Sequence, residues 1–179
     1  MLIVQWTPIT EIETVPPLGA ALAAHLAEKK GAVRHASCSA WHLLWQLLSE
    51  TGLPLSEVAF GDRGKPYFPG GELCFSLSHS RALCAAAMSD LPVGVDIERC
   101  RDSYRAHMIE RSLHASERAA FDGDFTRLWC RKESAAKLTG EGIIGFPNTI
   151  DTTRFTYTEQ QIAYAGERYW LAAATAKPD

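Results

Sequence analysis

Three acidic residues and a lysine in the second half of the chain have the spacing of a site for a divalent cation and phosphate. Asp96 and Glu98 stand two apart at the end of residues 93–98 (VGVDIE), so on a strand both carboxylates point to the same side. Glu133 and Lys137 stand four apart in WCRKESAAK, so on a helix they share one face. Three carboxylates would suit Mg²⁺, which takes oxygen ligands and fills its shell with water and substrate phosphate. Lys137 would then face the same phosphates.

The spacing of Glu133 and Lys137 also has an ordinary structural interpretation. Glu followed four residues later by Lys is common on exposed helices, where the pair contributes only ~0.3–0.5 kcal/mol. The two acids of the preceding strand favour the cation site instead, because two like charges on one side of a strand need a counter-ion.

Sequence patterns place both motifs on regular elements. A run of good helix formers begins near Asp124 and stops at Gly140, where a residue without Cβ can take the left-handed conformation that ends helices. Residues 93–98 are apolar up to their two acids, as in a buried strand. Residues 37–51 form the longest helical pattern, and we assign its apolar band to the core.

The first half of the chain contains a second group of polar residues. Residues 61–67 (GDRGKPY) have turn composition, and residues 72–80 (ELCFSLSHS) alternate as a strand that ends on Ser78, His79 and Ser80. Taken alone, the first segment predicts a hairpin-like loop, and a single His at a strand end is usually structural.

Taken together, these motifs resemble a known enzyme family. VGVDIE, followed about thirty residues later by WCRKESAAK, resembles the two signature motifs of the 4'-phosphopantetheinyl transferases at every defining position. GKPY followed by FSLSHS resembles the coenzyme-binding segment of that family. The nearest subgroup is the monomeric type that activates peptide synthetases and other carrier proteins. The resemblance is good over roughly residues 61–146.

The resemblance implies an activity. Such enzymes transfer the 4'-phosphopantetheine arm of coenzyme A to a serine of an apo acyl or peptidyl carrier protein, with Mg²⁺, and release adenosine 3',5'-bisphosphate. It implies three metal ligands, Asp96, Glu98 and Glu133, and catalytic roles for Glu133 and Lys137. Either Glu133 or a metal-bound water would accept the serine proton.

The resemblance also implies coenzyme-binding residues. Lys65, Ser78 and His79 would hold the 3'-phosphate, while Lys137 and Lys132 would offset charge near the α-phosphate. Lys29, Lys30 and Arg34, which follow a predicted helix, have two open interpretations: a solvated helix end or further phosphate contacts.

The family fold implies an α+β protein of two similar α/β halves related by a pseudo-two-fold axis, with coenzyme A between them. A boundary near Leu91 and Pro92 gives residues 1–91, with the coenzyme-binding segment, and residues 92–179, with the metal site and catalytic helix. Alanine-rich strands at 82–88 and 170–175 fit such a repeat.

The remaining segments have weaker patterns. We expect a strand at residues 2–6, a helix opening at Pro16 and Pro17, helical segments between 102 and 121, an apolar loop at 143–147 and three strands at 151–157, 161–165 and 168–175. Residues 102–121 have two interpretations. They form an ordinary exposed helical face or, as the resemblance to the family implies, part of the surface that binds the acidic helix of a carrier protein.

Composition limits the other functions. The 179 residues are 46% hydrophobic with a net charge of -3 and a pI of about 6.1, which excludes a broad nucleic-acid-binding surface. Five cysteines without a CxxC pair, and a start without signal-peptide features, predict a cytoplasmic protein. No apolar run is long enough to cross a membrane. With both halves in one chain, we expect a monomer.

Two other functions are compatible with these motifs. A Mg²⁺-dependent phosphohydrolase could use the same acids and lysine with water as nucleophile, but it would not need the GKPY and FSLSHS segments. A non-catalytic coenzyme A-binding module could keep the pocket without transfer, but it would not need the complete set of acids.

Overall fold

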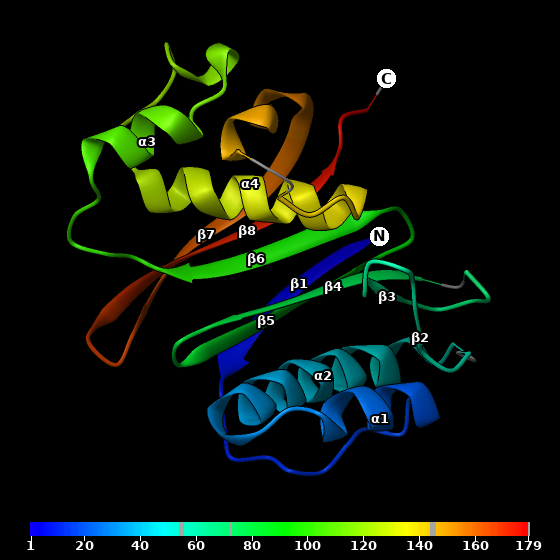
Figure 1. Ribbon diagram of the computed structural model, residues 1–179. Helices are drawn as coiled ribbons and strands as arrows, with labels where there is room; N and C mark the ends of the chain where they lie inside the picture. The colour runs from blue at the N-terminus through cyan, green and yellow to red at the C-terminus, as the bar shows by residue number, and fades with distance from the viewer. Residues whose placement is uncertain (54–55, 72, 144–145, 179) are drawn as a thin grey trace.

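The computed structural model describes residues 1–53, 56–71, 73–143 and 146–178. Two three-stranded antiparallel sheets lie between two helical layers, with α1 and α2 on one outer side and α3 and α4 on the other (Figure 1). In chain order the elements are β1 (Leu2–Pro8), α1 (Ala20–Ala27), α2 (Gly31–Thr51), β2 (Ala59–Phe60), β3 (Pro66–Tyr67), β4 (Cys74–Ser80), β5 (Leu83–Ser89), β6 (Val93–Arg99), α3 (Ala106–Ser112), η1 (Ala115–Glu117), α4 (Phe125–Thr139), η2 (Pro147–Thr149), η3 (Thr152–Arg154), β7 (Phe155–Tyr164) and β8 (Glu167–Ala176). The mixed helix and sheet content agrees with the predicted α+β class.

The two sheets have the same strand order. They run β1-β5-β4 and β6-β8-β7. In each sheet the strand that comes last in the chain lies in the centre and pairs with the other two strands. The central strands β5 and β8 are the alanine-rich segments seen in the sequence, and every residue of β5 is buried. Small side chains on the inner faces let the two sheets pack closely around a shared apolar cluster.

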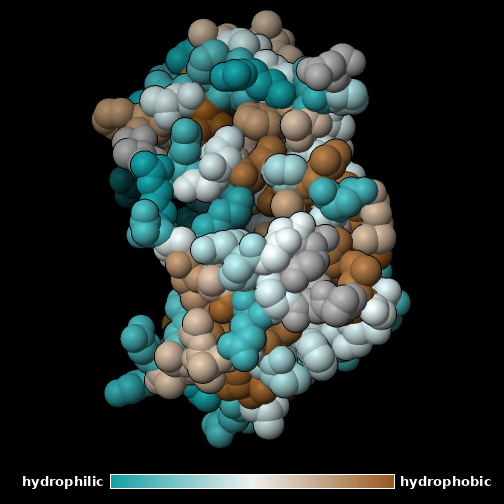
Figure 2. All heavy atoms as spheres, turned by 90° about the vertical axis from the view of Figure 1, so that its right-hand side faces the viewer, coloured by the Kyte–Doolittle hydropathy of each residue, from teal (hydrophilic) through white to brown (hydrophobic). Residues whose placement is uncertain are grey.

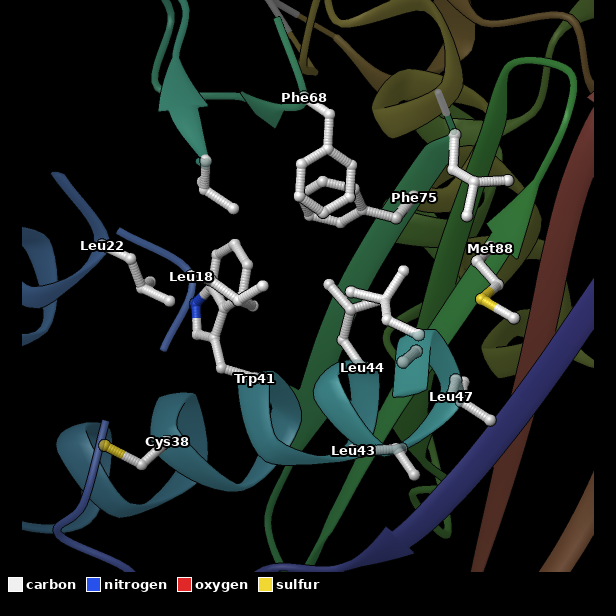
Figure 3. Packing of buried hydrophobic residues seen from close by; sticks show 14 of the residues in the cluster. Leu18, Leu22, Cys38, Trp41, Leu43, Leu44, Leu47, Phe68, Phe75 and Met88 are labelled. Atoms are coloured by element: carbon white, nitrogen blue, oxygen red, sulfur yellow. The ribbon is translucent and has the colours of Figure 1, made fainter. Parts of the chain in front are cut away.

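A second core lies between the first sheet and its helices. The apolar band of α2 faces β4 and β5, and the Trp41 ring meets the Phe75 ring edge-on at 5.5 Å (Figure 3). The helix begins at Gly31, earlier than the predicted residue 37, because residues 31–36 contain no helix breaker after its first glycine. It ends at Gly52 in the left-handed conformation, as predicted.

Helix α4 follows the sequence prediction at both ends. The Asp124 carboxylate caps its start by accepting a hydrogen bond from the Arg127 amide at 3.0 Å, and Gly140 ends it with φ of 74°. The helix rests directly on β6 at Gly94, where a Cβ would overlap the Ser134 carbonyl of α4. The glycine of the VGVDIE motif therefore permits the close contact that brings α4 to the acidic strand.

The C-terminal sheet differs from the prediction of three strands. Residues 155–164 form one continuous strand that pairs with β8, while residues 152–154 form a 3₁₀ turn. The polar middle of β7 remains a strand because Arg127 and Arg131 of α4 both bind Glu159 from its edge, at 2.7 and 2.6 Å. This correction joins two of the predicted strands into one.

The other elements agree with their predictions to within a few residues. The 61–67 segment lies between the short strands β2 and β3, and two helical segments occupy the 102–121 region. Glu72 of the predicted strand and residues 144–145 of the predicted apolar loop lie outside the described residues. Across the described ranges, no helix has both the length and the apolar character required to traverse a bilayer. Figure 2, turned to the right-hand side of Figure 1, shows hydrophobic and hydrophilic residues mixed on that face.

Candidate active site

A cavity of about 480 Å³ lies between the two halves of the molecule. Residues of α1, α2, β4 and the β2–β3 segment line one side, and Asp96 of β6 with the C-terminal end of α4 lines the other. Its floor includes the Trp41 and Phe75 rings. Members of both groups of polar residues singled out in the sequence, Asp96 and Lys137 from one and Lys65, Ser78 and His79 from the other, therefore line one cavity.

Asp96 is the central acid of this cavity. Its side chain is only 6% exposed, and its Oδ1 atom accepts hydrogen bonds from the Ser78 hydroxyl and the Lys137 ammonium, each at 2.8 Å. The Lys137 ammonium also donates to the Ser78 hydroxyl at 2.9 Å. The other oxygen, Oδ2, is buried without a hydrogen-bond partner. A buried carboxylate oxygen with no donor can accept a further positive group.

Alternate serines of β4 hold the acidic strand in place. The Val95 amide donates to the Ser76 hydroxyl at 3.0 Å, and the Ser80 hydroxyl donates to Glu98 Oε2 at 2.6 Å. With the bond from Ser78 to Asp96, three serines of one half thus contact the acidic strand of the other. Sequence reasoning gave no role to Ser76 and named Ser80 only as part of the strand end, although their alternation with Ser78 in FSLSHS puts all three on one face of the strand.

Glu133 lies close enough to Asp96 and Glu98 for their negative charges to affect its pKa. Burial raises the pKa of Glu133, and the negative charges of Asp96 and Glu98 raise it further, while Lys137 partly offsets them. Lys137 forms its ion pair with Asp96 across the cavity. The ordinary surface-helix interpretation, a pair between Glu133 and Lys137, is therefore not the pairing observed. We name Ser78, Asp96, Glu98, Glu133 and Lys137 the cleft cluster.

The cleft cluster has the chemistry of a site for a hard divalent cation. Within residues 1–53, 56–71, 73–143 and 146–178, no three His, Cys, Asp or Glu side chains are gathered closely enough to hold a metal ion as placed. The donors nevertheless fit one: all are oxygens, Asp96 Oδ2 lacks a partner, and mutual repulsion raises the pKa of Glu133. Asp96, Glu98 and Glu133 are the residues that would hold Mg²⁺.

Basic residues surround the rest of the cavity. The Lys65 ammonium donates to the Leu138 carbonyl near the end of α4 at 3.0 Å, and burial lowers its pKa. Partial desolvation and the charges of Lys137 and Lys29 lower the pKa of His79. Arg63 and His25 complete this basic rim. The rim offers several donors to an anion at a distance from the carboxylates.

The structure places Lys29, Lys30 and Arg34, whose roles have two interpretations in the sequence, in three different environments. Lys29 lies on the cavity wall. Arg34 instead donates to the carbonyls of Leu26 and Glu13, so it provides a hydrogen-bond donor for the C-terminal end of α1. Lys30 is the residue that precedes α2.

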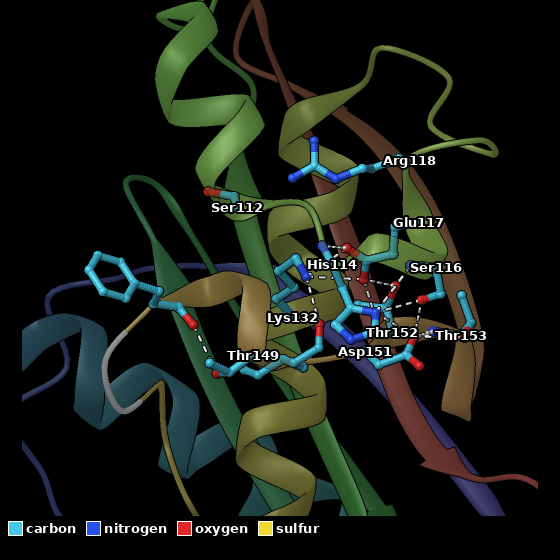
Figure 4. A network of polar contacts seen from close by, with 12 residues as sticks. Ser112, His114, Ser116, Glu117, Arg118, Lys132, Thr149, Asp151, Thr152 and Thr153 are labelled. Atoms are coloured by element: carbon cyan, nitrogen blue, oxygen red, sulfur yellow. Dashed lines mark hydrogen bonds and ion pairs between the residues drawn. The ribbon is translucent and has the colours of Figure 1, made fainter.

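Two predicted coenzyme-binding residues have other partners. The Ser78 hydroxyl donates to Asp96 instead of pointing freely at a phosphate site. Lys132 is fully buried and its ammonium donates to both Glu117 oxygens, at 3.0 and 2.8 Å, and to the Ile150 carbonyl at 2.7 Å (Figure 4). The predicted phosphate contact of Lys132 is therefore not supported, because its side chain points away from the cavity.

Glu117 gathers this second polar group, which we name the anchoring cluster: Glu117, Lys132 and Thr152. The Glu117 carboxylate accepts bonds from Lys132, from the Thr152 amide and hydroxyl at 2.9 and 2.6 Å, and from the His114 amide at 2.8 Å. The cluster ties α4 to η1 and η3 (Figure 4). Sequence reasoning gave Glu117 no role beyond the helical segments expected between residues 102 and 121.

A second cavity, of about 560 Å³, begins on the other side of Glu98. Its apolar lining includes Trp129, the aromatic residue of the helix motif, and Phe146. Arg101 and Arg111 lie on its rim, and the Arg111 guanidinium stacks over the Phe146 ring at 5.0 Å. A partner that brings an apolar group and negative charge would fit this cavity.

Comparison with known proteins finds a matching family model and several similar proteins. A model of the 4'-phosphopantetheinyl transferase superfamily matches residues 92–175. The chain is similar to the 4'-phosphopantetheinyl transferase AcpT of Salmonella typhi, with 36% identity over 127 residues that cover 64% of each chain. It is also similar to AcpT of Escherichia coli K12, with 37% identity over 105 residues that cover 52% of this chain and 54% of the relative.

A more distant relative is the 4'-phosphopantetheinyl transferase of Bacillus subtilis, 29% identical over 105 residues that cover 51% of this chain and 46% of the relative. The chain thus spans less than two thirds of the length of the curated relatives that it matches. The resemblance inferred from the two motifs is confirmed, because the family model matches residues 92–175 and the matched relatives carry the same family name.

Proposed function

We propose that this protein is a holo-[carrier protein] synthase that transfers 4'-phosphopantetheine from coenzyme A to a serine of an apo acyl or peptidyl carrier protein. The observation that carries the proposal is the ion pair of Asp96 and Lys137 on the wall of a cavity with a basic rim. Glu98 follows Asp96 on the same strand, and Glu133 is close enough that, besides burial, the charges of both strand acids raise its pKa. The names of the matched relatives support the same activity.

The transfer is a displacement at phosphorus. The carrier serine oxygen attacks the β-phosphorus of coenzyme A, a new P–O bond forms, and the bond to the oxygen bridging to the α-phosphorus breaks. Adenosine 3',5'-bisphosphate leaves with the electron pair of that bond. Mg²⁺, held by the three acids when bound, would neutralise pyrophosphate charge and so lower the barrier. The geometry leaves the protein to position both substrates and to accept one proton.

Glu133 is the protein group suited to accept the serine proton. Burial and the neighbouring acids raise its pKa, which makes it a stronger base than an ordinary glutamate. Lys137, one turn along the same helix, would donate to a pyrophosphate oxygen and oppose the charge that develops on the leaving group. A metal-bound water is the alternative proton acceptor.

The basic rim would hold the adenosine 3'-phosphate. Lys65, His79 and Lys29 surround the part of the cavity away from the carboxylates, and charge-assisted hydrogen bonds from them suit a phosphate with two negative charges. Ser78 acts through Asp96 in this proposal, and Lys132 contributes only through α4.

The carrier protein would dock over the second cavity. Carrier proteins present an acidic helix beside the reactive serine, and the cavity next to Glu98 combines an apolar floor with Arg101 and Arg111 on its rim. This arrangement would bring the serine to the side of Glu98 and Glu133 opposite the adenosine.

Three further features belong to the same proposal. The common strand order of the two sheets supports two halves, residues 1–91 and 92–179, related by a pseudo-two-fold axis. With the cavity between halves of one chain, we expect a monomer. Free coenzyme A and apo carriers are found in the cytoplasm, and we place the protein there.

Mass spectrometry of apo carrier proteins incubated with coenzyme A and Mg²⁺ tests the function. The carrier should gain the mass of one phosphopantetheine arm, and Asp96→Asn and Glu133→Gln should remove that gain while the fold survives. Loss of coenzyme A without carrier modification would indicate a phosphohydrolase. Tight coenzyme A binding without turnover on any acyl or peptidyl carrier tested would indicate a binding module.

A ligand pair tests the coenzyme orientation. Hydrogen bonds to charged groups contribute ~1.5–3 kcal/mol, so calorimetry should show at least roughly tenfold preference for coenzyme A over its 3'-dephospho form. His79→Ala should weaken coenzyme A and leave the dephospho form almost unchanged. Equal losses for the two ligands would mean that His79 only supports the strand end.

A further inference from the structure

Lys137 occupies one of the two oxygens of Asp96, the carboxylate that would hold a metal ion. Its ammonium lies 2.8 Å from Asp96 Oδ1, and the Ser78 hydroxyl fills a second direction at the same oxygen. A divalent cation bound to either oxygen of this carboxylate would place a second positive charge next to the ammonium. They cannot both occupy the site without strong repulsion.

The Lys137 side chain has room to move away from Asp96 within the cavity. Its side chain is 31% exposed and lines the cavity, whereas the Asp96 side chain is only 6% exposed and is held by β6. A long, flexible lysine can leave the carboxylate far more easily than the carboxylate can leave the strand. The pyrophosphate of coenzyme A would supply new acceptors for the ammonium within the same cavity.

We infer that Lys137 competes with the metal for Asp96 and thereby couples metal binding to coenzyme binding. This inference rests on the proposed function. Without coenzyme, the metal must displace an ion pair and leave an ammonium beside it. With coenzyme, the ammonium moves to a phosphate oxygen and the carboxylate is released. Because such coupling is reciprocal, metal also favours coenzyme binding.

Direct Mn²⁺ binding to the coenzyme-free protein, followed by electron paramagnetic resonance, tests the competition; Mn²⁺ shares the oxygen ligands of Mg²⁺. Lys137→Met removes the competing charge and should bind Mn²⁺ about tenfold more tightly than wild type, within the usual range of coupling between sites. The same variant should bind coenzyme A more weakly. Opposite changes for the two ligands are the signature of competition.

Lys65→Met is the matched control. Lys65 lines the same cavity and loses the same charge in the variant, but its ammonium bonds to the Leu138 carbonyl instead of Asp96. It should weaken coenzyme A while leaving Mn²⁺ affinity within about twofold of wild type. An equal rise in Mn²⁺ affinity for both variants would replace direct competition with a general charge effect and overturn the inference.

Unchanged or weaker Mn²⁺ binding by Lys137→Met would also overturn it, provided that circular dichroism shows a folded protein. If that variant does not fold, Lys137→Gln keeps a polar group of similar reach and should still tighten Mn²⁺ binding. The outcome is separable from the proposed function. If Lys137→Met binds Mn²⁺ more tightly but the wild type does not modify carriers, only the proposed transferase activity is contradicted. If the wild type modifies carriers but Lys137→Met binds Mn²⁺ as the wild type does, only the coupling is contradicted.

Discussion

Lys132 and Lys137 lie five residues apart on the same helix, and each pairs with a carboxylate at 2.8 Å. In the anchoring cluster, Lys132 is fully buried and both Glu117 oxygens accept hydrogen bonds. In the cleft cluster, Lys137 reaches solvent and Asp96 keeps one buried oxygen unpaired. A lysine–carboxylate pair therefore fixes α4 at the anchoring cluster, whereas the corresponding pair in the cleft cluster leaves a carboxylate oxygen free to bind another group.

The glutamates of the two clusters have opposite pKa shifts. Burial by itself raises the pKa of Glu117, but the bonds from Lys132 and Thr152 outweigh it and lower the pKa below its ordinary value. For Glu133, burial and the neighbouring acids act in the same direction and raise the pKa. Satisfied hydrogen bonds, rather than burial alone, separate the supporting site from the reactive one.

The largest expected effect is on stability at the anchoring cluster. Lys132→Met leaves the Glu117 charge buried without its partner and should lower the free energy of unfolding by about 3–5 kcal/mol. Lys137→Met, at a partly exposed pair, should lower it by about 1 kcal/mol or less. Urea unfolding measures both values. Similar losses for the two variants would mean that the clusters do not differ in this way.

The next effect is on transfer at the cleft cluster. Asp96→Asn keeps the side-chain size but removes the charge that would hold the metal, and it should reduce carrier modification about a hundredfold or more. Its free energy of unfolding should change little. Initial rates by mass spectrometry provide the measurement. Near-normal turnover in this variant would contradict the three-acid site.

A smaller effect is expected where α4 meets β6. Gly94→Ala forces the Ser134 carbonyl away from the strand and should destabilise the protein by about 1–3 kcal/mol. Its transfer rate should fall as well, because the shift separates Lys137 from Asp96. Unfolding and transfer assays on the same preparation test both results. Full activity with reduced stability would show that the cleft tolerates a displaced helix.

The smallest effect concerns pH. Glu117, with a lowered folded pKa, stabilises the protein above its unfolded pKa, and this stability is lost as pH falls through the folded value. Glu133, with a raised folded pKa, contributes stability at low pH that is lost as pH rises through the folded value. Near neutral pH, Glu117→Gln should therefore lower the melting temperature and Glu133→Gln should raise it slightly. Shifts of the same sign would contradict the comparison.

Much of the cleft could be predicted because its signals are local. Asp124 and Gly140 mark the ends of α4 by capping chemistry, and strand alternation alone places Asp96 beside Glu98. Lys132 was harder, because its partner Glu117 lies 15 residues earlier in a separate turn. Helical geometry did contain a warning, since Lys132 and Lys137 stand five residues apart and therefore point about 140° apart around the helix. A shared phosphate role for both lysines ignored that angle.

The contact between the two sheets has a consequence for protein engineering. The first half ends with β5 and the second begins with β6, and only residues 90–92 join them. The other contacts between them that the structure describes are non-covalent, and they include the serine bonds from β4, the bond from Lys65 to Leu138 and the apolar cluster between the sheets. A backbone break at this connection would leave each fragment with one complete sheet and its covering helices. Activity would then depend on reassembly of two polypeptides, which makes this chain a natural candidate for a split-enzyme reporter.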